Sequence, residues 1–99
     1  MANYLGVEIP PYKNRITAHG LSLGVSEYRH VQVSRASDGA ILYRSPGNAR
    51  RLKPLYAAFQ QTITPEMGQM IEVYSPGQCP DDIRRCRDMV AEALRPHLD

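Results

Sequence analysis

The chain has 99 residues, a net charge of +2 and two cysteines. This length predicts one globular domain with a modest core, and 42% hydrophobic with 22% charged residues is an ordinary folded composition. These values exclude an intrinsically disordered chain and a disulfide scaffold. No apolar run is long enough to cross a membrane, and the first residues, MANYLGVEIPPYK, contain no secretory apolar segment, so we expect a cytoplasmic protein.

The charges are distributed unevenly along the sequence. Residues 28–61 hold six basic residues and one acid, which gives +5, whereas residues 62–99 hold four basic residues and seven acids, which gives −3. Ten of the twelve basic residues are arginine, which binds carboxylates and phosphates through two parallel hydrogen bonds. The pattern indicates an anionic partner for the basic middle, although a GC-rich coding sequence would also enrich arginine.

Two strands are predicted at the start of the chain. NYLGVEI (residues 3–9) alternates as a strand does, and Pro10-Pro11 ends it. RITAHGLSLGV (residues 15–25) places alternate apolar residues on one face and predicts a second strand, with Gly20 as a bulge or break.

The segment YRHVQVSRASDGAILYR (residues 28–44) predicts a β-hairpin around Asp38-Gly39. A three-residue loop, with Gly39 in the left-handed conformation, pairs Val33 with Tyr43 and Arg35 with Ile41. It separates apolar from polar side chains better than a two-residue turn does. The inward residues are then Val31, Val33, Ile41 and Tyr43, and the outward ones are His30, Gln32, Ser34, Arg44 and, against the rule, Leu42.

A helix is predicted next, from helical spacing of apolar residues up to about Gln61. Its apolar residues are Leu52, Leu55, Tyr56, Phe59 and Ile63. Its start has three interpretations: a cap at Ser45 followed by Pro46, a cap at Asn48, or regular helix only from about Lys53. The last of these avoids a kink at Pro54, which lacks a backbone N–H.

The rest of the chain predicts a strand and a final helix. MGQMIEVY (residues 67–74) is nearly continuous in apolar character, which is typical of a central strand. From Pro80 to about Leu94, helical spacing predicts a helix with Asp81-Asp82 in its first turn, ended by Pro96. Its apolar face comprises Ile83, Cys86, Val90, Ala93 and Leu94. The order β-β-β-β-α-β-α predicts an α+β two-layer sandwich, a mainly antiparallel sheet of four to five strands with two helices on one face.

Cys79 is the one residue that suggests a covalent chemistry. The string VYSPGQCP, between a predicted strand and a predicted helix, resembles the active-site start of glutaredoxins and other thioredoxin-fold proteins. The resemblance covers about twenty residues and implies that Cys79 is an attacking thiol and that Pro80 shapes the start of the helix. The position of the family's second cysteine holds Asp82, and the acids that follow Cys79 oppose a thiolate, so a redox role is the least favoured function. Cys86 is expected in the core.

No other motif indicates an enzyme. The three histidines lack metal-ligand spacing, no glycine-rich phosphate loop is present, and nothing marks a nucleophile. The sequence therefore predicts a non-enzymatic protein without cofactor or metal.

The preferred function is protein–protein contact, or self-association, through a surface rich in arginine and tyrosine, residue types that are enriched in interface hot spots. Adaptors and inhibitors are such proteins, including phage or mobile-element proteins that inhibit a host complex. The alternative is a nucleic-acid-binding module that uses the basic segment 28–53, with Tyr28 stacking on bases. The predicted contact residues are Tyr28, Arg29, His30, Gln32, Arg35, Arg44, Arg50, Arg51 and Lys53.

Overall fold

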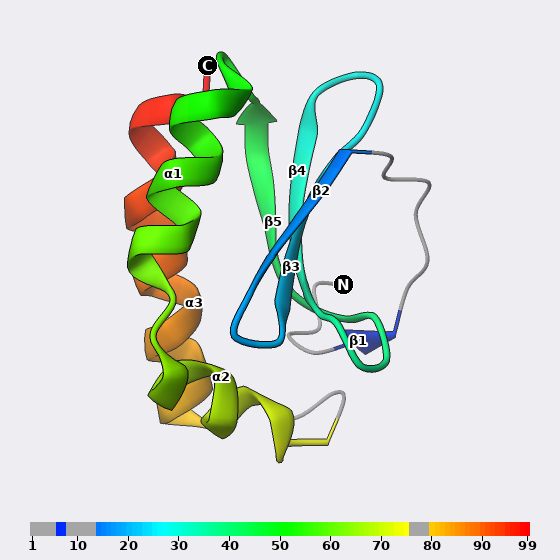
Figure 1. Cartoon of the computed structure of the whole chain (residues 1–99), viewed down its shortest axis with the longest axis vertical. Helices are drawn as coiled ribbons and strands as arrows, with labels where there is room; N and C mark the ends of the chain where they lie inside the picture. Colours follow the sequence, from blue (N-terminus) through cyan, green and yellow to red (C-terminus); the bar gives the residue numbers. More distant parts are fainter. Residues whose placement is uncertain (1–5, 8–13, 76–79) are drawn as a thin grey trace.

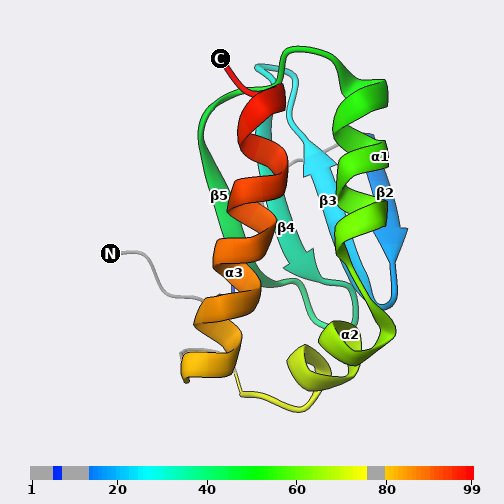
Figure 2. The same ribbon diagram turned by 90° about the vertical axis from the view of Figure 1, so that its left-hand side faces the viewer.

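The structure, a computed structural model, describes residues 6–7, 14–75 and 80–99. Its elements are β1 (Gly6–Val7), β2 (Asn14–Ala18), β3 (Leu21–Val25), β4 (His30–Arg35), β5 (Ala40–Asn48), α1 (Leu52–Thr62), α2 (Pro65–Glu72), α3 (Asp81–Leu94) and the short 3₁₀ helix η1 (Arg95–His97). The described strands form one antiparallel sheet in the order β1-β5-β4-β3-β2. Helices α1 and α3 cover one face of this sheet (Figure 1), and they run side by side across it (Figure 2). The predicted α+β class is confirmed.

The predicted strand over residues 15–25 is wrong, because the segment forms a hairpin of two strands. β2 and β3 pair up to Ala18 opposite Leu21, which leaves a two-residue turn. His19 and Gly20 both have positive φ, 49° and 85°. A two-residue turn with this backbone follows the right-handed twist of the paired strands, and glycine adopts it without strain. Gly20 therefore reverses the chain where a bulge or break was predicted.

The predicted left-handed glycine of the β4–β5 hairpin is confirmed, but the predicted three-residue loop is wrong, because four residues (36–39) connect Arg35 to Ala40. Gly39 has φ 78°, in the left-handed region, and Val33 pairs with Tyr43. Val33 is fully buried and Tyr43 nearly so, on the sheet face that α1 and α3 cover. Burial raises the pKa of the Tyr43 phenol.

The predicted pairing of Arg35 with Ile41 is wrong, because β5 contains one extra residue. Ser34 pairs with Ile41 instead, and the register shifts between this pair and the next one. Leu42 is the residue left over in the bulge, and its side chain is completely buried in the core. The bulge removes the defect in the predicted pattern: Leu42 turns inward, and Ile41 shares the outer face with Ser34.

The predicted helix caps at Ser45 and Asn48 are wrong, because both residues belong to strand β5, which ends at Asn48. The hydroxyl of Ser45 accepts a hydrogen bond from the N–H of Val31 at 3.0 Å and donates one to the carbonyl of Gly47 at 2.6 Å. These bonds replace regular strand pairing at a second register shift, between His30 and Gln32. Pro46 fits there because it has no backbone N–H to contribute to strand pairing.

Helix α1 begins at Leu52, as the third interpretation of its start predicted. Pro54 lies in the first turn, where an N–H would have no partner within the helix, so no kink results. Leu55, Phe59 and Ile63 are buried against the sheet, which confirms the predicted apolar stripe.

The predicted strand over residues 67–74 is wrong, because most of the segment lies in helix α2. The hydroxyl of Thr64 accepts a hydrogen bond from the N–H of Met67 at 3.2 Å and caps the helix, Pro65 follows, and Glu66 lies in the first turn. The string Thr-Pro-Glu was the overlooked signal, and it outweighs the apolar run that follows. The buried residues, Met67, Gly68 and Ile71, lie on one helix face.

The final helix agrees with its prediction. α3 begins after Pro80, and its buried residues are Ile83, Cys86, Val90 and Leu94. Burial, and then the nearby Asp82 carboxylate, raise the pKa of the Cys86 thiol, so this cysteine behaves as a core residue. Among the helices that the structure describes, none combines the length and the apolar character that crossing a membrane requires.

Candidate partner-binding surface

Arg35, a predicted contact residue, is not on the surface. It is only 4% exposed, and its guanidinium donates to both carboxylate oxygens of Asp38, at 2.9 and 2.6 Å. It also donates to the carbonyls of Ile71, at 2.8 Å, and Tyr74, at the end of α2. Arg35 therefore ties the end of helix α2 to the β4–β5 hairpin and cannot contact a partner.

The Arg35 guanidinium, with help from the N–H of Ala40, lowers the pKa of Asp38 from 3.8 to about 2. A carboxyl group with a lowered pKa stabilises the folded state above its unfolded pKa and loses that contribution as the pH falls through its folded pKa. Because Asp38 is 39% exposed, we expect a loss of only about 1 kcal/mol between pH 4 and pH 2. Urea unfolding at several pH values measures this loss of stability. In Asp38→Asn, the loss between pH 4 and pH 2 should be smaller by the contribution of Asp38, while the contributions of the other carboxylates remain.

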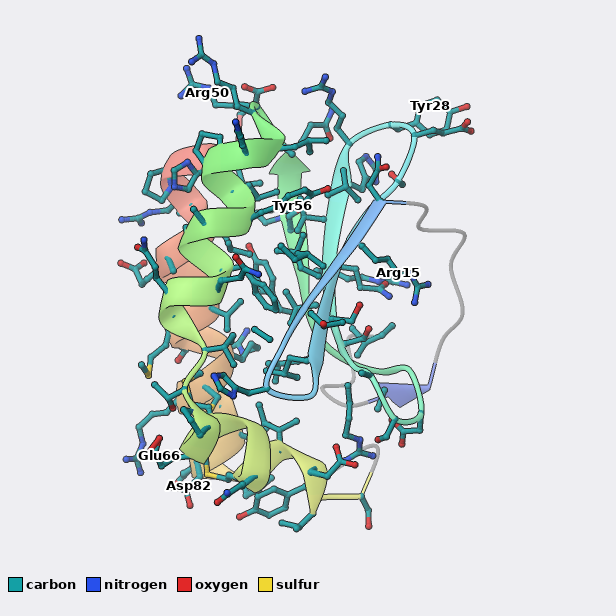
Figure 3. All side chains as sticks on the ribbon, viewed as in Figure 1. Arg15, Tyr28, Arg50, Tyr56, Glu66 and Asp82 are labelled. Atoms are coloured by element: carbon teal, nitrogen blue, oxygen red, sulfur yellow. The ribbon has the colours of Figure 1, made fainter. Side chains whose placement is uncertain are left out.

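The outer face of the sheet is less open than predicted. Gln32 and Ser34 are buried, and Arg44, although exposed, donates from Nε to the side-chain oxygen of Gln32 at 3.1 Å. Arg15 also points to this side of the sheet, away from the helices (Figure 3). None of the described strands presents an exposed aromatic side chain here, so a stacking platform for nucleic-acid bases is lacking on this part of the chain.

The other six predicted contact residues gather at one end of the longest axis of the molecule. Figure 3 shows Tyr28 and Arg50 at this end, and Glu66 and Asp82 at the opposite end. We call this surface the basic end; it comprises Tyr28, Arg29, His30, Arg50, Arg51 and Lys53, all exposed.

Backbone hydrogen bonds connect the two segments of the basic end to each other and to residues 97–98. The N–H of Ala49 donates to the carbonyl of Arg29 at 2.7 Å, which joins the β3–β4 turn to the end of β5. The N–H of Arg50 donates to the carbonyl of His97 at 2.9 Å, and Ala49 forms a β-bridge with Leu98. Residues distant in sequence thus form one continuous surface.

Arg29 is conformationally unusual. Its φ of 65° lies in the left-handed region, where glycine or asparagine is preferred and other residues cost about 1 kcal/mol or more. Its N–H donates to the carbonyl of Ser26 at 2.9 Å, and its Nη1 donates to the carbonyl of Arg50 at 2.8 Å. The side chain therefore braces the connection between β5 and α1.

An open hollow of about 640 Å³ lies at the basic end. The residues that line it are Arg29, Ala49, Arg50, Arg51, Pro54, Pro96, His97 and Asp99. Five of these eight were not among the predicted contact residues: Ala49, Pro54 and the last three. The last three reach the hollow through the β-bridge at Leu98, and no local signal in the sequence marks that long-range contact.

Positive charge in the basic end is only partly compensated. Arg50 Nε lies 3.6 Å from Asp99 Oδ1. Arg51 and Lys53 make no ion pair with any residue of the described ranges, and the first turn of α1 contains no acid. Because the start of a helix is itself positive, this arrangement favours an anionic partner.

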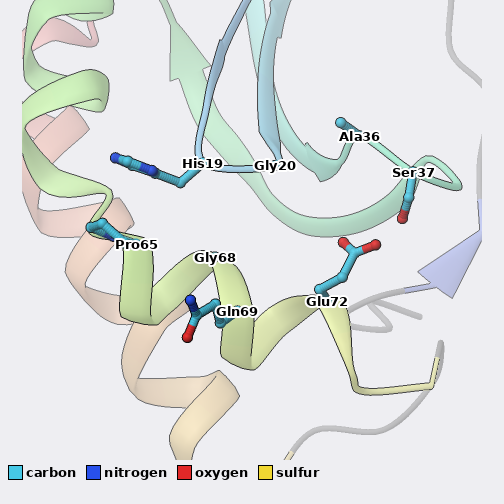
Figure 4. A pocket seen from close by; sticks show the side chains of 8 residues that line it. All are labelled: His19, Gly20, Ala36, Ser37, Pro65, Gly68, Gln69 and Glu72. Atoms are coloured by element: carbon cyan, nitrogen blue, oxygen red, sulfur yellow. The ribbon is translucent and has the colours of Figure 1, made fainter.

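A second hollow, of about 540 Å³, lies between α2 and the turns of the two hairpins. Figure 4 shows the His19 ring beside Pro65, whereas the Glu72 and Ser37 side chains lie at the other end of the hollow. Gly68 lies between them, so the titratable groups do not converge on one point. This arrangement does not form an acid–base pair or a nucleophile with its base.

Cys79 lies outside the described residues, so the structure does not test the thiol hypothesis. In the part of the chain that is described, no three histidine, cysteine or acidic side chains are grouped to hold a metal ion. Comparisons with protein-family models, curated proteins and solved structures find no match for this chain.

Proposed function

We propose that this protein is a non-enzymatic binding protein whose basic end contacts an acidic surface of a protein partner. The observation that carries the proposal is the gathering of six predicted contact residues, from two distant segments, on one exposed surface. An adaptor or an inhibitor of the kind that phages and mobile elements direct against host complexes would act in this way, in the cytoplasm.

The residue types favour a protein over a nucleic acid as the partner. Tyr28 is 73% exposed at the tip of a turn and is followed by the exposed Arg29. Tyrosine and arginine are both enriched in protein interface hot spots. The described residues provide no second exposed aromatic ring beside it, whereas single-strand binders stack successive bases on several rings.

Charge reversal tests the proposal. The double variant Arg51→Glu/Lys53→Glu should bind a fluorescent glutamate-rich peptide about tenfold more weakly than the wild type in anisotropy titrations at about 0.15 M salt. Acids at the N-cap (residue 51) and in the first turn (residue 53) of α1 should also raise the free energy of unfolding by about 0.5 kcal/mol, so weaker binding would not result from unfolding.

Arg84→Glu/Arg85→Glu is the matched control. It changes the net charge equally, but these residues pair with Asp81 and Asp82 at the opposite end of the molecule, beyond the range of screened charges. Its affinity should stay within about twofold of the wild type. Equal weakening in both double variants would contradict a localised site. If the wild type binds an oligothymidine more tightly than the peptide, and Arg51→Glu/Lys53→Glu abolishes that binding, the partner is a nucleic acid and not a protein.

A further inference from the structure

We propose that Asp99 is a built-in competitor for the partner, and that an acidic side chain of the partner displaces its carboxylate from Arg50. This inference rests on the proposed function. The acidic side chain of the partner would bind in the hollow at the basic end. In the free protein, Asp99 would fill that position.

Asp99 is the one acid among the residues that line the hollow, where three arginines and a histidine surround it. Its Oδ1 lies 3.6 Å from Arg50 Nε, and both side chains are more than half exposed. Solvent, and therefore another carboxylate, can reach the same guanidinium. Asp99 thus occupies the position that the acid of a partner would take.

The pair between Arg50 and Asp99 is loose. A charge-assisted hydrogen bond between a guanidinium and a carboxylate is typically about 2.7–2.9 Å long, and the best pairs make two such bonds in parallel. At 3.6 Å, Asp99 leaves the donors of Arg50 available for a closer ligand. A carboxylate that approaches in the plane of the guanidinium can therefore replace it.

The backbone of Arg50 is held in place while its side chain remains exchangeable. Its N–H donates to the carbonyl of His97, and its own carbonyl accepts a hydrogen bond from Arg29 Nη1. Arg29 maintains that brace from a left-handed backbone, a conformation that is kept at a cost in stability. Such a cost is typical of residues that prepare a binding position.

The walls of the hollow suit an acidic side chain of a protein. Pro54 and Pro96 contribute apolar surface on which the methylene groups of glutamate can pack. Arg51 lies next to Arg50 and makes no ion pair with a described residue, so it can bind a second acid of the same segment. The occupant is therefore a protein segment with two or more acidic residues close together.

The test compares Asp99→Asn with Glu66→Gln in titrations with the glutamate-rich peptide. Both variants raise the net charge by one, but Glu66 lies at the opposite end of the molecule (Figure 3). Asp99→Asn should tighten binding by up to about fivefold, the limit for one exposed ion pair, and Glu66→Gln by less than about twofold. In an Arg50→Gln background, the Asp99→Asn change should tighten binding by clearly less than it does in the wild type.

Gly47→Ala separates displacement from charge. A Cβ at Gly47 would overlap the backbone oxygen of Asp99, so this variant moves Asp99 away without changing any charge, and it too should tighten binding. If it does not fold, the comparison of Asp99→Asn with Glu66→Gln decides.

The inference would be overturned if Asp99→Asn and Glu66→Gln changed the affinity for the peptide equally. It would also be overturned if Asp99→Asn tightened binding as much in the Arg50→Gln background as in the wild type. The proposed function would survive that result as long as Arg51→Glu/Lys53→Glu still weakens binding. A wild type that does not bind the peptide would instead refute the proposed function, and the inference with it.

Discussion

Arg35→Leu should lower the free energy of unfolding by about 3 kcal/mol. The guanidinium is almost completely buried and donates to carbonyls at the end of α2 as well as to Asp38. Leucine would leave those carbonyls without donors in a place that water reaches poorly. Urea denaturation followed by circular dichroism at neutral pH measures the difference.

Two further arginine variants make the test specific. Arg51→Leu removes an exposed guanidinium that has no ion pair within the described ranges, so it should change stability by no more than about 0.5 kcal/mol. Arg35→Lys keeps the charge but cannot reach Asp38 and the carbonyls at the same time, so an intermediate loss is expected. A loss below about 1 kcal/mol for Arg35→Leu would show that the end of α2 does not depend on this contact.

Gly68→Ala should destabilise the protein by about 2–3 kcal/mol, although replacing glycine by alanine inside a helix usually stabilises it by about 1 kcal/mol. A Cβ at Gly68 would overlap the backbone oxygen of His19 in the turn between β2 and β3 (Figure 4). Because that oxygen belongs to the backbone, a change of rotamer cannot relieve the overlap. Helix α2 would have to move away from the turn and would lose core contacts of Met67 and Ile71.

Gln69→Ala is the control for Gly68→Ala, because it lies on the exposed side of the same helix. It should change the free energy of unfolding by less than about 0.5 kcal/mol. Thermal and urea unfolding of both variants, compared with the wild type, give the two values. A gain in stability for Gly68→Ala would contradict the close packing of α2 on the β2–β3 turn.

Local sequence signals were sufficient where a residue's own chemistry decides the backbone. Gly39 in its left-handed turn, the acid-rich start of α3 and the apolar stripe of α1 were all predicted correctly. α2 was predicted wrongly although its cap was present in Thr64 and Pro65, because a short, mostly apolar segment such as residues 67–74 fits a buried strand and a buried helix alike. Within β5, the apolar pattern could not reveal the bulge at Leu42.

The candidate surface divides in the same way. The sequence alone determined that the basic charge is concentrated in residues 28–53, because charge follows directly from residue identity. Tertiary structure alone decided how those residues are used: it buried Arg35 against α2, left Arg29, Arg50 and Arg51 around one hollow, and brought Asp99 to its edge. The physical reason is that side-chain exposure and long-range backbone pairing, such as the bridge between Ala49 and Leu98, depend on how distant segments pack.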